Sequence, residues 1–247
     1  MNINKSPTTR GQVFTALKTP PFRRYWMGSL ASVLGFQIML IAQGWLVYDL
    51  SGEEIYLGYA GLAAGIPAIL LNAFGGVVAD KVDPRRLLMI TQTACCVLMI
   101  ILGTITSLGI VEIWHVLLFA FLIGCVNAFD MPTRQALFPH LINREDMMNA
   151  VALNSMVWQG TRVVGPAIGG IIIGTRFGEG PGFFAASVGF VTMAFVAYSL
   201  VVPEIKRASG NSMAHELIQG IRYVWMHPIF LFLIGMTFFN SIFGMSY

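Results

Sequence analysis

The sequence predicts an all-α membrane protein, a bundle of six transmembrane helices with a seventh begun before Tyr247. Of its 247 residues, 56% are hydrophobic and 11% are charged, whereas a soluble domain carries about 25% charged residues. Several stretches of about 20 residues contain no charged residue, and this is the length that crosses a bilayer as a helix. The 26 glycines suit helices that pack closely in a membrane. This composition argues against a soluble enzyme and against a disordered chain.

Six apolar runs define the expected spans, after a polar and basic tail at residues 1–24. Each run can cross about 30 Å of hydrocarbon as a helix rising 1.5 Å per residue. The runs cover residues 25–48, 55–79, 87–109, 112–132, 148–175 and 181–203. A polar linker containing an amphipathic helix is expected over 204–227, and residues 228–247 begin the seventh span.

Residues between the runs support these boundaries. Asp83 and Pro84 form an N-cap followed by proline in the first turn of the third span. Asn143 is expected to cap the fifth span, with acidic residues in the first turn, where the helix dipole favours carboxylates. Pro203 is expected to close the sixth span.

The basic residues lie almost entirely on one side of the predicted bundle. Only Arg176 falls on the opposite side, and Arg162 falls within a span. The other thirteen are Lys5, Arg10, Lys18, Arg23, Arg24, Lys81, Arg85, Arg86, Arg134, Arg144, Lys206, Arg207 and Arg222. By the positive-inside rule, this bias places the N-terminus in the cytoplasm of a multi-pass protein of the inner (plasma) membrane.

The loop between the second and third spans has a distinctive charge pattern. It carries one glycine and four charged residues, namely Gly76, Asp80, Lys81, Arg85 and Arg86. They resemble the loop G-x-x-x-D-R/K-x-G-x-R/K-R/K of the major facilitator superfamily, with Asp83 where that family usually has glycine. The resemblance implies a conformational latch, in which Asp80 pairs with a cation such as Arg85 or with a helix N-terminus from elsewhere. The alternative is a simple positive-inside loop with a helix cap.

The fifth span carries a second motif, which comprises Arg162, Gly165, Pro166, Gly169 and Gly170. It resembles the G-P-x-x-G-G core of exporters in the same superfamily. Pro166 removes a backbone donor and the glycines narrow the helix, so a kink or a close helix contact is expected. The alternative is an ordinary kinked and tightly packed membrane helix.

A third set of residues points to a branch of this superfamily. Asp130-Met-Pro132-Thr-Arg134-Gln135 and the segment 149–155 resemble enterobactin-exporter-like and macrolide-efflux-like permeases. Such permeases have twelve spans, with 3+3 inverted repeats in each half. The resemblance therefore implies the N-terminal half and the start of the seventh span. Similar Gly/Pro segments begin at Gly65 and Gly165 in corresponding spans of the two repeats, although chance similarity is the alternative.

Polar residues within the spans are candidates for substrate binding or coupling. Beyond Arg162, they are Asp49, Asp130, Gln37, Gln43, Asn72, Asn127, Asn154 and Gln159, and Arg134 just after the fourth span is a further candidate. Arg162 is expected either to bind a substrate anion or to pair with Asp130. Asp130 is alternatively a helix cap or an ion-pair partner of Arg134. Asp49 is either a proton carrier or a solvated helix end, and each amide either lines a cavity or bonds another helix.

The sequence has no H-E-x-x-H, P-loop or G-x-S-x-G motif, so neither an enzyme nor an ATP-driven pump is expected. No cofactor, metal or nucleic-acid partner is expected either. The resemblance implies a secondary active transporter that exports a small organic molecule in exchange for protons by alternating access. Its expected partners are the substrate, protons, the lipid bilayer and a C-terminal bundle beyond Tyr247. The alternative is a truncated, non-transporting fragment or a half-size subunit that needs a partner bundle.

Overall fold

The computed structural model describes residues 14–174 and 178–200, together with nine scattered residues between Met226 and Phe239. The chain divides into two units, Met1–Arg207 and Ala208–Tyr247. The nine residues of the second unit are all helical. Pro203 and, apart from Met226, the expected linker at 204–227 lie outside the described residues.

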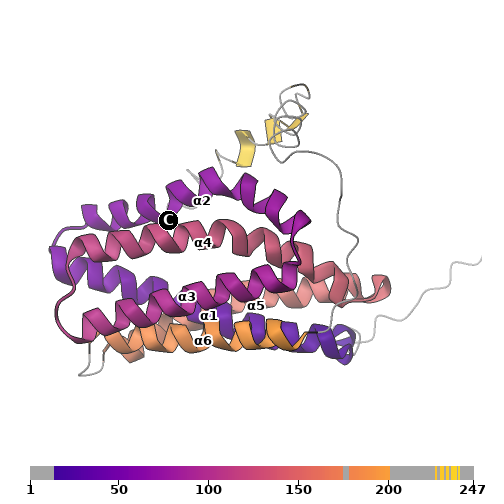
Figure 1. Ribbon diagram of the computed structural model, residues 1–247, viewed down its shortest axis with the longest axis horizontal. Coiled ribbons are helices and arrows are strands. Elements are labelled where there is room, and N and C mark those ends of the chain that lie inside the picture. Colours follow the sequence, from indigo (N-terminus) through magenta and orange to yellow (C-terminus); the bar gives the residue numbers. More distant parts are fainter. Residues whose placement is uncertain are drawn as a thin grey trace, which may run out of the picture. The chain divides into compact units, whose positions relative to one another are not determined.

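The described part of the first unit is built from helices, six of them long (Figure 1). The long helices are α1 (Pro20–Ser51), α2 (Ile55–Lys81), α3 (Pro84–Ser107), α4 (Ile113–Leu137), α5 (Met147–Ile173) and α6 (Gly180–Ser199). Three short 3-10 helices accompany them, η1 (Thr15–Lys18), η2 (Phe138–Leu141) and η3 (Arg144–Asp146). The predicted all-α fold is confirmed, and each predicted span corresponds to one of the long helices.

The largest differences from the predicted boundaries lie in α1 and α4. Helix α1 begins at Pro20 because proline suits the first helical turn, where its missing N–H is not needed. Arg23 and Arg24 therefore lie in the helix and not in a tail. Helix α4 continues through Pro132 to Leu137, so the predicted end of the fourth span was too early.

Two of the predicted caps have different outcomes. Asp83 caps α3 as expected, since its carboxylate accepts a bond of 2.9 Å from the backbone N–H of Arg85. The prediction for Asn143 is wrong: this residue precedes η3 and makes no side-chain cap bond. The expected acidic first turn forms the 3-10 helix, and α5 itself begins only at Met147.

Lower apolarity separates α5 from the other long helices. Among the described residues, five helices are long and apolar enough to cross a membrane, and α5 is not one of them. Its 27 residues include Asn149, Asn154, Ser155, Gln159 and Arg162. The polarity of α5 is thus the first structural sign of a site.

The helix pairs follow a regular exchange. The most extensive contacts are α2 with α4, α3 with α6, α1 with α6, α1 with α5, and α3 with α4. When α1 is exchanged with α4, α2 with α5 and α3 with α6, this set of pairs maps onto itself. The arrangement agrees with the predicted 3+3 repeat. Figure 1 shows the helices lying lengthwise beside one another.

Reciprocal glycines bring the backbones of α2 and α4 together. A Cβ atom on Gly75 would meet the carbonyl group of Ala128 in α4, and one on Gly124 would meet the carbonyl group of Ala64 in α2. Each helix therefore supplies a glycine to the backbone of the other. Such contacts let membrane helices approach closely and gain packing energy.

Candidate functional site

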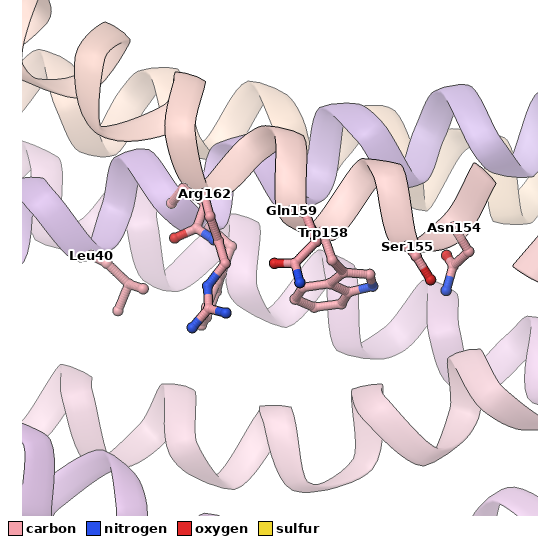
Figure 2. A pocket seen from close by; sticks show the side chains of 8 residues that line it. Leu40, Asn154, Ser155, Trp158, Gln159 and Arg162 are labelled. Atoms are coloured by element: carbon pink, nitrogen blue, oxygen red, sulfur yellow. The ribbon is translucent and has the colours of Figure 1, made fainter. Parts of the chain in front are cut away.

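An open pocket lies along the contact between α1 and α5 (Figure 2). Its volume is about 420 Å³, within the range of small-molecule sites. The lining residues are Phe36, Gln37 and Leu40 from α1 and Asn154, Ser155, Trp158, Gln159 and Arg162 from α5. The pocket therefore offers one ligand a cation, several amides, a hydroxyl group and aromatic rings.

The α5 side of the pocket follows from helical periodicity. Asn154, Trp158 and Arg162 are spaced four residues apart, as are Ser155 and Gln159, and this spacing places side chains on one face of a helix. Figure 2 shows Trp158 and Arg162 projecting from α5 toward the same side. One turn of the helix separates neighbours, so the polar stripe extends about 12 Å along α5.

Contacts on both sides of this stripe hold α5 against α1. The indole N–H of Trp26 donates a 3.1 Å hydrogen bond to the carbonyl oxygen of Leu153. Beyond the stripe, Gly165 lies directly against Gln37, where a Cβ atom would overlap the Gln37 side chain. The span-five glycine motif therefore brings α5 next to a pocket residue. The lining side chains thus face open space, while contacts at both ends of the stripe join α5 to α1.

Arg162 is the cation of the pocket. It lies near the middle of α5 and its side chain is exposed. Within the described part of the chain it forms no hydrogen bond or ion pair, and no lining residue is acidic. The expected alternative, a pair with Asp130, is wrong because Asp130 has another partner.

That partner is Arg134, in the same helix. The Arg134 Nε atom donates to Asp130 Oδ2 at 2.6 Å, and both side chains are buried, with exposed fractions of 8% and 6%. The other carboxylate oxygen, Oδ1, accepts bonds of 2.7 Å from Thr91 Oγ1 and from Gln92 Nε2. Arg134 was predicted in a cytoplasmic loop, which is wrong because α4 continues past it.

The remaining donors of Arg134 reach α1. Its terminal nitrogens donate to Ser29 Oγ at 3.3 Å and to Ser32 Oγ at 2.7 Å. Ser32 Oγ in turn donates to Gln92 Oε1 at 2.8 Å. A closed ring of bonds thus joins α1, α3 and α4, and every buried side-chain N or O atom of the described residues has a partner. We call these residues, together with Thr91, the buried polar cluster.

The latch residues lie around the start of α3. Arg85 does not pair with Asp80 as expected: its Nε donates to Ala197 O at 2.9 Å and its Nη2 to Tyr198 O at 2.5 Å. The last carbonyls of α6 attract this cation because the C-terminal end of a helix is negative. Asp80 is exposed and forms no ion pair in the described part of the chain. Gly76 has open space where a Cβ would stand.

Two basic latch residues lie near the start of α3, whereas the last residues of the span-five motif lie elsewhere, in α5. Arg86 lies 3.7 Å from the Asp83 carboxylate and is largely exposed, and Lys81 ends α2. Gly169 packs against Ile41 of α1. Pro166 lies within α5 and Gly170 faces open space.

The other predicted site residues are dispersed. Asn154 lines the pocket. Asp49 is exposed near the end of α1, Gln43 is buried in α1, and Asn127 is half-buried in α4. None of these three lines the pocket. No metal-binding group of His, Cys, Asp or Glu occurs among the described residues.

Sequence reasoning missed several residues of both sites. Trp158 was treated only as part of an apolar run, although its spacing from Asn154 and Arg162 is a usable signal. The serines of the buried polar cluster, Ser29 and Ser32, are also one helical turn apart. Their bonds to Arg134 connect residues more than 100 positions apart, and no local pattern contains that information.

Comparison with known proteins reveals extensive similarity. The profile of a family described as transmembrane secretion effector matches residues 12–242. The staphyloferrin A transporter of Staphylococcus aureus is 32% identical over 150 residues, which are 60% of this chain and 38% of that protein. The multidrug efflux pump Tap of Mycolicibacterium fortuitum is 24% identical over 87% of this chain and 54% of its own length.

A third relative comes from the branch that the motifs resemble. The enterobactin exporter EntS of Shigella boydii is 21% identical over 86% of this chain and 51% of its own length. The chain thus spans about half the length of these relatives, or less. No solved structure matches it significantly.

Proposed function

Because the chain belongs to the transmembrane secretion effector family, a group of efflux-like permeases in the major facilitator superfamily, we propose that it exports a small organic molecule. Export is driven by protons through alternating access, and the pocket between α1 and α5 is one wall of the substrate site. The observation that carries this proposal is Arg162, which lies in an open pocket near the middle of α5 and has no partner among the described residues.

The position of the pocket supports this function. Secondary transporters bind substrate near the bilayer midplane, at the interface between repeats. Helices α1 and α5 come from different halves of the predicted 3+3 repeat. The polar stripe faces open space and would lie against lipid if nothing covered it, which is costly. A substrate cavity closed by a second bundle removes that cost.

The direct test measures transport into everted membrane vesicles. The vesicles contain the protein expressed from its complete native gene. A panel of labelled organic molecules is offered, with and without a proton uncoupler. We expect accumulation of at least one compound inside the vesicles and its loss on uncoupling. Accumulation that persists with uncoupler and requires ATP would contradict the proposed energy source. Absence of accumulation across the panel would count against export.

The latch is part of the same proposal. Arg85 ties the start of α3 to the end of α6, which leaves the Asp80 carboxylate accessible to a helix N-terminus of another bundle. We expect Asp80→Asn and Arg85→Ala to impair transport while insertion and abundance in the membrane stay unchanged. Wild-type transport rates for both variants would remove the latch from the proposal.

A second bundle and a cytoplasmic N-terminus belong to the proposal as well. Helix α2 exposes Ile69 and Leu70 at 78% and 65% of their surface, and Gly58, Gly61 and Gly65 have open space beside them. We expect a helix of the second bundle to cover this face of α2. Cross-linking from cysteines introduced on this face tests the contact.

The cytoplasmic side of the N-terminus has a test of its own. A Lys5→Cys variant should react with an impermeant thiol reagent only from the cytoplasmic side.

A further inference from the structure

The lining of the pocket also indicates the chemical class of its substrate, an inference that rests on the proposed function. We propose that the pocket binds organic anions that carry an aromatic or apolar ring. Arg162 binds the anionic group, Trp158 contacts the ring, and Gln159 and Asn154 bond other polar groups of the ligand.

The charge of the pocket is the first step of the argument. Arg162 is its cation, no lining residue is acidic, and no described side chain neutralises the guanidinium. A guanidinium presents several donors in one plane and binds carboxylates through two parallel bonds. A ligand cation would instead meet an uncompensated positive charge.

The spacing of Arg162 and Trp158 adds the second requirement. They are four residues apart on α5, and side chains with this spacing are neighbours about 6 Å apart. Phe36 and Leu40 of α1 line the pocket as well. A ligand with an anionic group one or two bonds from a ring therefore contacts the guanidinium and the apolar lining together. Gln159 and Asn154 then provide amide donors and acceptors along the same stripe.

The anionic group has two possible sources in a membrane, a dissolved organic molecule or the phosphate of a lipid. The apolar side chains beside Arg162 favour the organic molecule, because a lipid headgroup is polar around its phosphate. The experiment must still separate the two, and the choice of detergent or bilayer does so.

Three matched probes test the class: 2-naphthylacetate, 2-naphthylacetamide and 2-(2-naphthyl)ethylamine. They share the ring and differ in charge. Binding is measured by equilibrium dialysis with the protein from its native reading frame, purified in an uncharged maltoside detergent. We expect the acetate to bind about tenfold more tightly than the amide or the amine. Equal affinities, or tighter binding of the amine, would overturn the proposal.

Variants then assign the preference to residues. Arg162→Gln should weaken acetate binding about tenfold and leave amide binding unchanged, which also reports an intact fold. Arg162→Lys should retain part of the preference. Trp158→Leu should weaken all three probes alike, and Trp158→Phe should restore them. The matched control is Arg144→Gln, because Arg144 is exposed and lies outside the pocket. A preference that survives in Arg162→Gln would overturn the assignment.

Two further arms separate the remaining outcomes. If acetate binds in detergent but not in phosphatidylglycerol nanodiscs, lipid phosphate occupies Arg162 and the inference is wrong. If export occurs but shows no preference among the three probes, the substrate class fails and the proposed function stands. If the binding preference follows Arg162 while vesicles transport nothing, the proposed function fails and the substrate class stands.

Discussion

Arg134 of α4 and Arg162 of α5 have opposite surroundings. Arg134 is buried, pairs with Asp130 and uses its other donors on two serines of α1. Arg162 is exposed in an open pocket and has no partner among the described residues. The charge of Arg134 thus joins helices, whereas that of Arg162 is the one we propose to bind a ligand. The partners of the charge, and not its presence, distinguish these uses.

The two surroundings predict different costs of mutation. In the buried polar cluster, removal of one member leaves another charge or dipole without a partner in a dry site, which is strongly destabilising. In the pocket, removal of a polar side chain leaves nothing unpaired. Apart from the test of Asp130, each test compares two residues. One belongs to the buried polar cluster or to the contact of Gly165 with Gln37, and its matched control faces open space.

The largest effect is expected for Asp130→Ala. The guanidinium of Arg134 would stay buried without its counter-charge, and the free energy of unfolding should fall by about 3–5 kcal/mol. Denaturant titration in detergent, followed by circular dichroism, measures it. The double variant Asp130→Ala/Arg134→Met should recover most of the loss, because neither charge remains. If the double variant lost as much free energy of unfolding as the two single variants together, the cost of Asp130→Ala would not come from the unpaired charge of Arg134.

The next effect tests whether the support of the pocket is rigid. In Gly165→Ala the new Cβ atom meets the side chain of Gln37, and we expect a loss of about 2–3 kcal/mol from overpacking between α1 and α5. Gly170→Ala is the control, since nothing lies within 4 Å of the Cβ position. It should change the stability by less than about 0.5 kcal/mol. Equal effects in the same titration would mean that α5 is not held against Gln37.

A smaller effect separates two serines. Ser32→Ala removes the hydroxyl that accepts from Arg134 and donates to Gln92, at an expected cost of about 1–2 kcal/mol. Ser155→Ala in the pocket loses only a bond to the carbonyl oxygen of Val151 in its own helix. We expect its unfolding midpoint to match that of the wild type. A destabilised Ser155→Ala would show that the pocket contributes to the fold.

The smallest effect on stability is expected for Arg162→Gln. No described partner is lost, so the free energy of unfolding should stay within about 0.5 kcal/mol of the wild-type value. Arg134→Gln, which makes the same exchange inside the cluster, should cost several kcal/mol. A loss above about 1 kcal/mol for Arg162→Gln would mean that this arginine has a structural partner, and the contrast between the two arginines would disappear.

Features encoded over a few residues were predictable from the sequence. The Asp83 cap depends on a bond to the second residue after it, and the pair of Asp130 with Arg134 spans one helical turn. The apolar runs were equally direct, because span length depends only on bilayer thickness. Helix ends were less certain: the apolar run ended at Pro132, but α4 continues through this proline to Leu137.

Features that join distant residues were not predictable from local pattern. Arg85 bonds to carbonyls more than 100 positions away, so of the two kinds of partner expected for Asp80, the pair with Arg85 was wrong. The α5 stripe of the pocket follows helical periodicity, but its α1 wall depends on how two helices meet. Gln37 was expected either to line a cavity or to bond another helix, but its contact with Gly165 arises from tertiary packing.

The reciprocal glycines of α2 and α4 have a consequence for inheritance. Every single-base missense change in a glycine codon encodes a residue with a Cβ atom. At Gly75 this atom meets the Ala128 carbonyl group, and at Gly124 it meets that of Ala64. No missense change at either codon thus spares the contact, whereas adjacent Gly76 has open space beside it and can mutate without disturbing the α2–α4 contact. The glycine contacts between these helices are therefore expected to tolerate little missense change.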